Sequence, residues 1–546
     1  MYIPTDQKQP GPESAEGSAV AARVRLMRDG LLNYAGFLVS GLVGIVMVPV
    51  MMHALGNELY GVWIAMLSMI ALGSIVDLGL GWTITREVAA GTGERSSESA
   101  HLVRAARDGF ILVGAGGALV VGLLGVAAAR TEHFSPATAQ VLAEVFCLGG
   151  VIFFAGQMTE FARSLLRGLR RFDLVSLLAA GFAVAWALGV ITVIACGGKL
   201  LAVATVYAVV AIATAVGAAK LGSAAFPEIG ERYQRGEFSV LRGRFSFGVA
   251  SQAVAILTTV LWEVAPLVIG WMLGPRAIVP YHVGRKFPLA AALIGWSAAG
   301  ALFPAASESA HHRGSARARE TFEVGTRWIL AMVAPLCVMF WILAPNLLHA
   351  WLGSASPEMV AVMRVMSAVV MADALGEAGL YFLWGCGEVF PVLAVAACEL
   401  AAHLVLLVWM LGHFGPVGAA WALLIPKIFG SLALVVLTSR WCAIGHREFA
   451  RNTLAGLLAP LGALVLVLWF GVSIMNPAGW PGVIAVSTLA AAIYGAVFYR
   501  TGARLEERTL IRQALAIPLA GAGVLAMTML SLRQRDGSRV GRRRAM

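Results

Sequence analysis

The sequence predicts an all-α, polytopic membrane protein with about 14 transmembrane helices. Hydrophobic residues make up 59% of the 546 residues and charged residues only 13%, whereas roughly 25% are charged in a soluble domain. Apolar stretches recur from Leu31 to Leu532, and a helix of about 20 residues crosses a hydrocarbon layer of about 30 Å. Basic residues also gather in alternate loops. These observations exclude a soluble globular enzyme, a disordered chain and a fibrous protein.

The chain begins with a polar segment that contains Pro4, Pro10 and Pro12. This segment lacks the basic start and apolar core of a secretory signal peptide. We therefore expect residues 1–27 to form a disordered cytoplasmic tail. Basic residues up to Arg28 precede the first span, and they favour a cytoplasmic N-terminus.

The predicted spans follow the apolar stretches in order. The first six lie near residues 30–54, 60–84, 108–129, 138–162, 174–195 and 200–220. The next six lie near residues 247–272, 278–302, 323–345, 358–384, 389–411 and 416–438. The last two lie near residues 453–475 and 481–499.

A further apolar segment at residues 513–532 has base-rich sequence on both sides. If it crossed the membrane, the basic tail from Arg533 to Arg544 would lie outside, against the positive-inside rule. A surface or hairpin segment on the cytoplasmic side satisfies the rule, and a fifteenth span is the alternative.

The net charge of +11 is explained by the loops. With the N-terminus inside, the outer loops carry Arg130, Lys199 and Arg276, and the other loop arginines fall inside. This asymmetry agrees with the positive-inside rule. No basic stretch carries a nucleic-acid-binding module, so nucleic acid is not an expected partner.

Two similar hairpins indicate an internal repeat. Pro49 precedes Leu55-Gly56 in the first span pair, and Pro266 precedes Leu273-Gly274 in the seventh and eighth spans. Parallel repeats build some transporters, but these residues are common in membrane helices, so chance is the alternative. The repeat implies four parts, namely a first lobe (28–222), a second lobe (223–440), two appended spans (441–500) and a basic cytoplasmic tail (501–546).

Motifs for cofactors and metals are missing from the sequence. The six cysteines are scattered without a CxxC pair, as is typical of small buried apolar residues. Neither a phosphate-binding loop nor an HExxH motif occurs. We therefore expect no metal and no cofactor, and transport driven by an H⁺ or Na⁺ gradient or by the membrane potential.

Ionisable residues within the spans are the candidate functional groups. Each costs about 2.5–3.5 kcal/mol at mid-membrane on insertion scales, so each should face a partner or a wet cavity. The candidates are Asp77, Glu160, Glu263, Arg285, Lys286, Arg364, Asp373, Glu377, Glu399, His403 and Lys427.

Spacing suggests which of these groups meet. A short turn joins the spans of Glu263 and Arg285, so the two side chains can pair. Glu399 and His403 are four residues apart and share one helix face. Lys427 and Asp373 fall near the same midplane, and together these positions predict a polar, mixed-charge cavity in the second lobe. The alternative is that Glu263–Arg285 and Glu399–Lys427 are ion pairs with a purely structural role.

Three stretches carry a family resemblance. Asn33 to Arg86 contains P-V-M-M-H-A-L-G-N-E-L-Y-G-V-W and D-L-G-L-G-W-T-I-T-R, Phe161 to Phe172 reads F-A-R-S-L-L-R-G-L-R-R-F, and Glu263 to Tyr281 contains E-V-A-P-L-V-I-G-W-M-L-G. They resemble the first helix pair, the loop after the fourth helix and the seventh-to-eighth hairpin of Wzx-type polysaccharide flippases. These belong to the multidrug/oligosaccharidyl-lipid/polysaccharide (MOP) exporter superfamily, related to lipid II flippases. The family often has Asp where this chain has Glu263.

The resemblance implies two six-helix lobes in a V-shaped, pseudo-two-fold arrangement, with the last two spans beside them. It implies a flippase of the bacterial inner membrane, working by alternating access in O-antigen or lipopolysaccharide synthesis. The implied substrate is an isoprenoid (undecaprenyl) diphosphate-linked oligosaccharide. Membrane lipids, a polysaccharide polymerase and glycosyltransferases are the implied partners.

Such a substrate suggests roles for the charged residues. A lipid-linked diphosphate carries two negative charges, so fixed cations in a wet cavity would bind it. The expected anion contacts are Arg28, Arg285, Lys286 and Lys427, with Arg86 and Arg364 behind them. The expected ion-coupling residues are Asp77, Glu263, Asp373, Glu399 and His403.

Three other functions compete with a flippase. A cation-coupled multidrug exporter of the same superfamily usually has twelve spans, and the two appended spans argue against it. A membrane-embedded glycan-processing enzyme would need carboxylates and histidines clustered in a sizeable outer loop, and the outer loops here are short. A non-catalytic scaffold is the third alternative.

Overall fold

The computed structural model describes residues 12–73, 79–90, 97–130, 136–226, 246–309, 313–504 and 507–509. Every regular element in these ranges is helical, so the predicted all-α class is confirmed. The chain forms two compact units, residues 1–443 and 444–546. The division of the first unit into two lobes stays a prediction. The terms first lobe and second lobe refer below to residues 28–222 and 223–440.

Twelve helical stretches in the described ranges are long and apolar enough to cross a membrane. Two of them each consist of two helices that join at a glycine with positive φ, Gly56 in α1 (Pro12–Gly73) and Gly415 in α14 (Val389–Trp441). If each of these two stretches is counted as two helices, the described ranges agree with the predicted number of about 14 spans. The protein is a multi-pass membrane protein.

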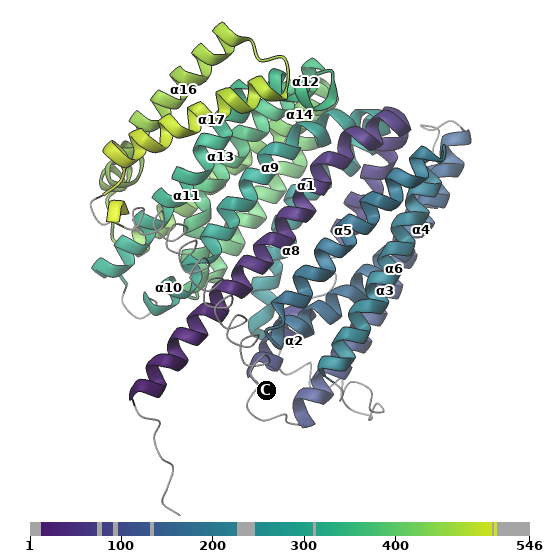
Figure 1. The fold of residues 1–546 in the computed structure, drawn as a ribbon, viewed down its shortest axis with the longest axis horizontal. Coiled ribbons are helices and arrows are strands. Elements are labelled where there is room, and N and C mark those ends of the chain that lie inside the picture. The colour runs from purple at the N-terminus through teal and green to yellow at the C-terminus, as the bar shows by residue number, and fades with distance from the viewer. Residues whose placement is uncertain are drawn as a thin grey trace, which may run out of the picture. The chain divides into compact units, whose positions relative to one another are not determined.

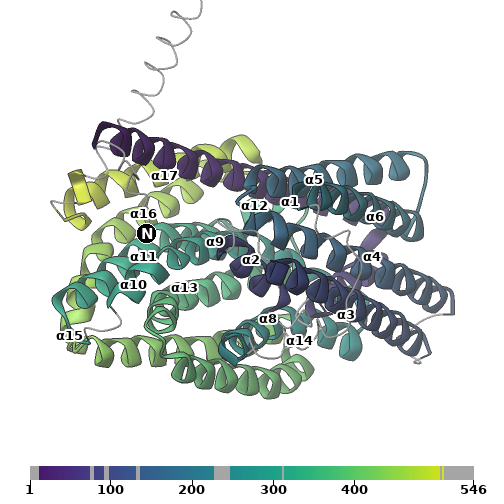
Figure 2. The ribbon, with the colours of Figure 1, turned by 90° about the horizontal axis from the view of Figure 1, so that it is seen from below.

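The first lobe continues from α1 with five further helices. They are α2 (Leu80–Ala90), α3 (Ser97–Ala129), α4 (Pro136–Gly168), α5 (Phe172–Ala195) and α6 (Leu200–Ala225). Helix α4 packs against α2, α3 and α6, and α5 packs against α1 and α6. Figure 2 shows α3, α4 and α6 side by side.

The start of α1 corrects one prediction. Residues 12–27 were expected to be part of a disordered tail, but the helix begins at Pro12. Proline is favoured in the first turn of a helix, where its missing N–H is not needed. The alanine, glutamate and arginine residues that follow are good helix formers, so the segment can extend the first span. Residues 1–11 lie outside the described ranges.

The two predicted hairpin turns have the same backbone conformation. Gly56 has φ 73° and ψ 168°, and Gly274 has φ 84° and ψ 168°. This region of backbone space is essentially restricted to glycine. The shared conformation at matching Leu-Gly positions supports the internal repeat.

The second lobe is built around α13 (Figure 1). This helix packs against α9, α10, α11 and α14, so buried positions recur along its length. The remaining elements are α8 (Ser246–Leu273), η3 (Pro275–Ala277), α9 (Ile278–Gly300), α10 (Leu302–Ser309), α11 (Ala316–Ile342), α12 (Ala344–Leu352) and α13 (Pro357–Gly385).

The main packing between the two lobes is made by α1 against α8, η3 and α9. At the hairpin turns, Arg276 pairs with Glu58 at 3.2 Å. A Cβ atom on Gly61 would overlap the carbonyl of Pro275, so only glycine allows this approach. The two repeat-related turns therefore touch each other.

The second compact unit holds the two appended spans. Helix α16 (Ala455–Met475) and helix α17 (Trp480–Val497) pack against each other. The shorter elements are α15 (His446–Phe449), η4 (Ala450–Leu454) and η5 (Phe498–Gly502). The apolar segment 513–532 lies outside the described ranges, so the fifteenth span stays an open alternative.

Candidate functional site

The first charged pair lies between α8 and α9. The short connection at η3 turns the chain back, so Glu263 and Arg285 face each other as predicted. Arg285 Nη2 donates to Glu263 Oε2 at 2.9 Å, and Nη1 donates to the carbonyl of Trp262 at 2.7 Å. The guanidinium also lies over the ring of Tyr281, 5.7 Å from its centroid. Arg285 is therefore buried and neutralised by a carboxylate.

The second charged group joins three helical segments at mid-span. Lys427 Nζ lies 3.0 Å from Glu399 Oε2 and 3.1 Å from Asp373 Oδ1, as the matching depths predicted. The three side chains are each less than 10% exposed. Trp296 Nε1 donates to the other oxygen of Asp373 at 2.8 Å. We call Asp373, Glu399 and Lys427 the Lys427 cluster.

Small residues allow the helices around this cluster to pack closely. A Cβ atom on Gly430 would overlap Oε1 of Glu399, and one on Gly376 would lie 2.7 Å from Cα of Ser431. Glu377 lies one turn from Asp373, and His403 lies one turn from Glu399; both are buried. The cluster is enclosed by protein.

Lys286 has a different environment. Its half-buried side chain points at the first lobe, and its Nζ lies 3.9 Å from the place where a Cβ on Gly44 would be. Within the described ranges no carboxylate forms an ion pair with Lys286. Among the described residues, it is thus an ammonium without an ion pair of its own, on the side of α9 that faces the first lobe.

Lys286 and Arg285 have different surroundings because they lie on two adjacent faces of α9. Tyr281 and Arg285 share one face, four residues apart, which packs against α8. His282 and Lys286 share the neighbouring face, which meets α1. The His282 ring contacts the Tyr60 ring of α1 edge-on at 6.1 Å, and its buried Nδ1 has no hydrogen-bond partner.

The sequence analysis missed His282 as a site residue. Its position four residues before Lys286 was the available signal, because that spacing places two side chains on the same helix face. It also missed the hydrogen bond from Trp296 to Asp373, since nothing in the sequence says which residue a tryptophan N–H meets.

Two further predicted site residues, Arg364 and Arg86, lie elsewhere in the described part of the chain. Arg364 Nε donates to the carbonyl of Trp341 at 3.2 Å, which ties α13 to α11. Arg86 is exposed on α2. Arg28 belongs to α1, but its side chain lies outside the described part of the chain, as does the whole of Asp77.

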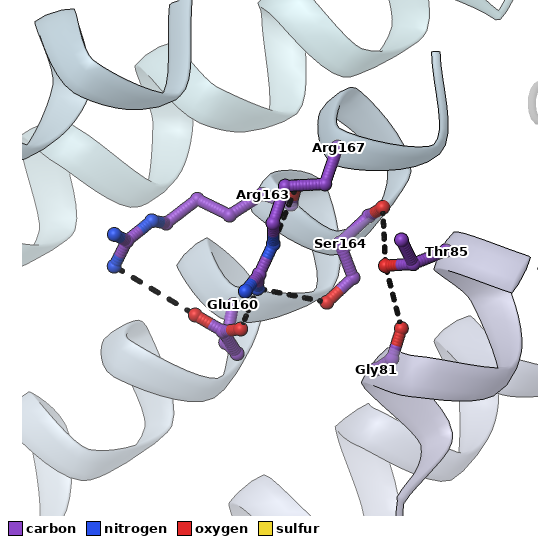
Figure 3. A network of polar contacts seen from close by, with 6 residues as sticks. All are labelled: Gly81, Thr85, Glu160, Arg163, Ser164 and Arg167. Carbon is purple, nitrogen blue, oxygen red and sulfur yellow. Dashed lines mark hydrogen bonds and ion pairs between the residues drawn. The ribbon is translucent and has the colours of Figure 1, made fainter. Parts of the chain in front are cut away.

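A separate polar network ties α4 to α2 in the first lobe (Figure 3). Glu160 pairs with Arg163 at 3.7 Å and with Arg167. Thr85 donates a bifurcated hydrogen bond to the carbonyls of Ser164 at 3.0 Å and Gly81 at 2.9 Å. The hydrogen bond from Thr85 to Ser164 ties the two helices, whereas the contacts of Arg163 and Arg167 lie within α4.

Just beyond this network, Arg171 lies in the turn before α5. It donates two hydrogen bonds of 3.1 Å to Asp173. The hydrogen bond and then the charge of Asp173 raise the pKa of the Arg171 guanidinium above its usual value.

A family description matches slightly more than half of the chain. Residues 26–310 match the family described as "Polysaccharide biosynthesis protein". The chain belongs to this polysaccharide biosynthesis protein family. The resemblance to Wzx-type flippases is thereby confirmed. The matched residues include Arg285 and Lys286 but end before the Lys427 cluster. No curated protein matches the chain.

Solved structures of transporters share the fold. "Lipid II flippase MurJ, inward closed conformation" has a TM-score of 0.63 and 12% identity, covering 86% of this chain and 99% of that one. An inward-facing multidrug resistance MATE family transporter of the MOP superfamily has a TM-score of 0.58 and 14% identity, covering 77% and 98%. The eukaryotic MATE transporter AtDTX14 has a TM-score of 0.54 and 15% identity, covering 79% and 99%.

The family and the fold together support a lipid-linked saccharide flippase or a related MOP transporter. The folds matched are those of transporters and flippases. What this chain moves, and what drives it, depend on the site.

Proposed function

We propose that this protein is a non-enzymatic flippase that moves an isoprenoid-diphosphate-linked oligosaccharide from the cytoplasmic to the outer leaflet by alternating access. It would act in the bacterial inner membrane with its N-terminus in the cytoplasm. The observation that carries the proposal is Lys286, an ammonium between the two lobes that pairs with no carboxylate of the described residues.

An unpaired charge at this depth needs a reason. Desolvating an ammonium without a partner is costly, so the group must face water or an anion. A diphosphate supplies two negative charges, and lysine binds phosphate well as a point charge. His282, on the same face of α9, has a buried ring nitrogen without a hydrogen-bond partner among the described residues. We assign both to the diphosphate.

Arg285 and Lys427 support the site less directly. Each already pairs with a carboxylate, so each would bind substrate only after its ion pair opened. Arg28 keeps its proposed role as an anion contact, and Arg86 and Arg364 stay proposed outer contacts.

Alternating access also needs a driving force. We propose that a proton or sodium gradient, or the membrane potential, resets the two lobes. Glu263 is the first candidate for coupling, because its side chain is 22% exposed and can reach water. Asp77, Asp373, Glu399 and His403 remain proposed coupling residues. Glycosyltransferases would supply the substrate and a polysaccharide polymerase would consume the product.

The test is leaflet-resolved measurement of the lipid-linked glycan in a deletion strain. Cells carrying Lys286→Gln should accumulate glycan that a membrane-impermeant sugar-modifying reagent cannot reach, at wild-type protein level. A charge-assisted hydrogen bond is worth about 1.5–3 kcal/mol, so transfer should fall by roughly 10- to 100-fold.

Two variants control this experiment. Lys286→Arg keeps the charge and should retain part of the transfer. Lys199→Gln removes an exposed lysine in a loop between spans and should have no effect. Transfer at the wild-type rate in Lys286→Gln would remove Lys286 from the site and with it the support for this proposal.

A multidrug exporter is the second candidate, because MATE transporters share the fold. Loss of the protein would then sensitise cells to cationic drugs and leave the surface glycan unchanged. A membrane-embedded glycan-processing enzyme would instead change the chemical structure of the glycan. The leaflet measurement separates the three outcomes.

A further inference from the structure

The Lys427 cluster has the charge pattern of an occupied cation site. Two carboxylates from different helical segments point at one position, and the ammonium of a third segment fills it. We propose that Lys427 is a tethered counter-ion that takes the place of a mobile monovalent cation. The wild-type protein would then bind no sodium ion between Asp373 and Glu399, and removing the ammonium would create a sodium site.

The first argument is charge balance. Asp373 and Glu399 are each 6% exposed, and Glu377 lies buried one turn away. Adjacent carboxylates in a closed, apolar setting require a positive charge. Lys427 is the one cation that pairs with them among the described residues.

The second argument is that contacts other than that with the lysine restrict the carboxylates. Trp296 fixes one oxygen of Asp373 by a hydrogen bond of 2.8 Å. Glu399 has no such partner among the described residues: its Oε1 is buried without a hydrogen bond, in the space that a side chain at position 430 would need. Removing the ammonium would therefore leave Asp373 Oδ1 in position, and the close packing around Gly430 limits where the Glu399 carboxylate can move.

The third argument is the space that the lysine side chain leaves. Its stem runs from the second leg of α14 to the carboxylates, so a shorter apolar side chain opens a volume next to them. Anionic oxygens that converge on an enclosed space are suitable ligands for a hard cation. A sodium ion would restore the charge balance that the lysine provides in the native protein.

For transport, the inference rests on the proposed flippase function. If Lys427 replaces a mobile cation, then Asp373 and Glu399 do not bind a transported sodium ion in the wild-type protein. Sodium coupling, if the protein uses it, would have to act elsewhere, and Glu263 is the more accessible carboxylate. Asp373 and Glu399 would remain candidates for proton coupling alone.

The experiment measures stability and needs no transport assay. Purified full-length protein is unfolded by heat in sodium chloride and in choline chloride of equal ionic strength, at mildly alkaline pH. The wild-type melting temperature should be the same in both salts. That of Lys427→Met should be lower in choline and rise by several degrees, saturably, with sodium.

Two results would overturn the inference. One is stabilisation of the wild-type protein by sodium over choline, and the other is a folded Lys427→Met that does not respond to sodium. If Lys427→Met cannot be purified, the same measurement is made on the double variant Lys427→Met/Glu399→Gln. The double variant buries one negative charge fewer and should therefore fold more readily. A sodium response in that double variant supports the inference, and its absence refutes it.

These outcomes are independent of the proposed function. A protein that moves no lipid-linked glycan could still show the sodium response. A working flippase could equally fail to show it. Lys286→Gln, measured in the same two salts, is the matched control, and its melting temperature should not depend on sodium.

Discussion

Lys286 and Lys427 belong to the same lobe and lie at similar depth, yet their surroundings are opposite. Each lies twelve residues beyond a turn glycine, Gly274 or Gly415, or about 18 Å along a helix. Lys427 is enclosed and bound by two carboxylates, whereas Lys286 faces α1 of the other lobe and pairs with no carboxylate of the described residues. A charge deep in a membrane protein therefore indicates function only when its partner is known.

The largest expected difference between the two lysines is in the free energy of unfolding that is lost when each is replaced. In sodium-free buffer, Lys427→Met leaves two buried carboxylates without their cation and should lower the free energy of unfolding by about 3–5 kcal/mol. Lys286→Met loses no ion pair to a described residue and should change it by less than about 0.5 kcal/mol. Chemical denaturation in detergent measures both. Equal losses in the two variants would contradict the contrast.

The Glu263–Arg285 pair should stabilise the fold, whether or not Glu263 also takes part in coupling. Glu263→Gln leaves the buried Arg285 without its carboxylate and should cost about 1–3 kcal/mol of unfolding free energy. The double variant Glu263→Gln/Arg285→Met should be closer to wild type than the two single losses added together. Unfolding measurements on all four proteins give the coupling energy. If the losses of the two single variants simply add, the coupling energy between Glu263 and Arg285 is zero.

His282 should affect transport without affecting stability. His282→Phe keeps the ring contact with Tyr60 but removes the nitrogen that has no protein partner. Losing one hydrogen bond of about 1 kcal/mol to substrate should slow leaflet transfer by roughly fivefold, with an unchanged melting temperature. His413→Phe, at an exposed position, is the control. A large loss of stability in His282→Phe would instead indicate a structural role.

The contact between the two hairpin turns should have the smallest effect. Arg276 is 77% exposed, so its pair with Glu58 is worth about 0.2–1 kcal/mol at most. Glu58→Gln should change the rate of leaflet transfer slightly at low salt and not at all at high salt, where exposed charges are screened. Arg130→Gln, an exposed control, should show no such salt dependence. An effect that persists at high salt would mean that Glu58 acts by something other than charge.

Several elements were predictable because they depend on neighbours in sequence. The predicted spans 174–195 and 453–475 nearly coincide with α5 and α16, because a long apolar run in a membrane can satisfy its backbone only as a helix. The pairing of Glu263 with Arg285 followed from the short turn between their helices. Residues 12–27 were predicted to be disordered because they are polar and close to prolines, but they form the start of α1. Their helix propensity had the larger effect.

Other features depended on contacts between distant segments. Glu323 and Arg327 are buried in α11 although neither was a candidate site residue. Trp296 of α9 donates its hydrogen bond to Asp373 of α13, and His282 of α9 contacts Tyr60 of α1. No periodicity or spacing within one segment records such contacts.

The sequence alone determined that this is a helical multi-pass membrane protein, where its main turns lie and which residues carry charge into the bilayer. Those properties follow from local hydropathy and from glycine at strained turn positions. Only the tertiary structure decided that the ammonium of Lys427 pairs with two carboxylates and that of Lys286 with none of the described residues. The two lysines are chemically identical and equally deep, so the difference comes entirely from the helices packed against them.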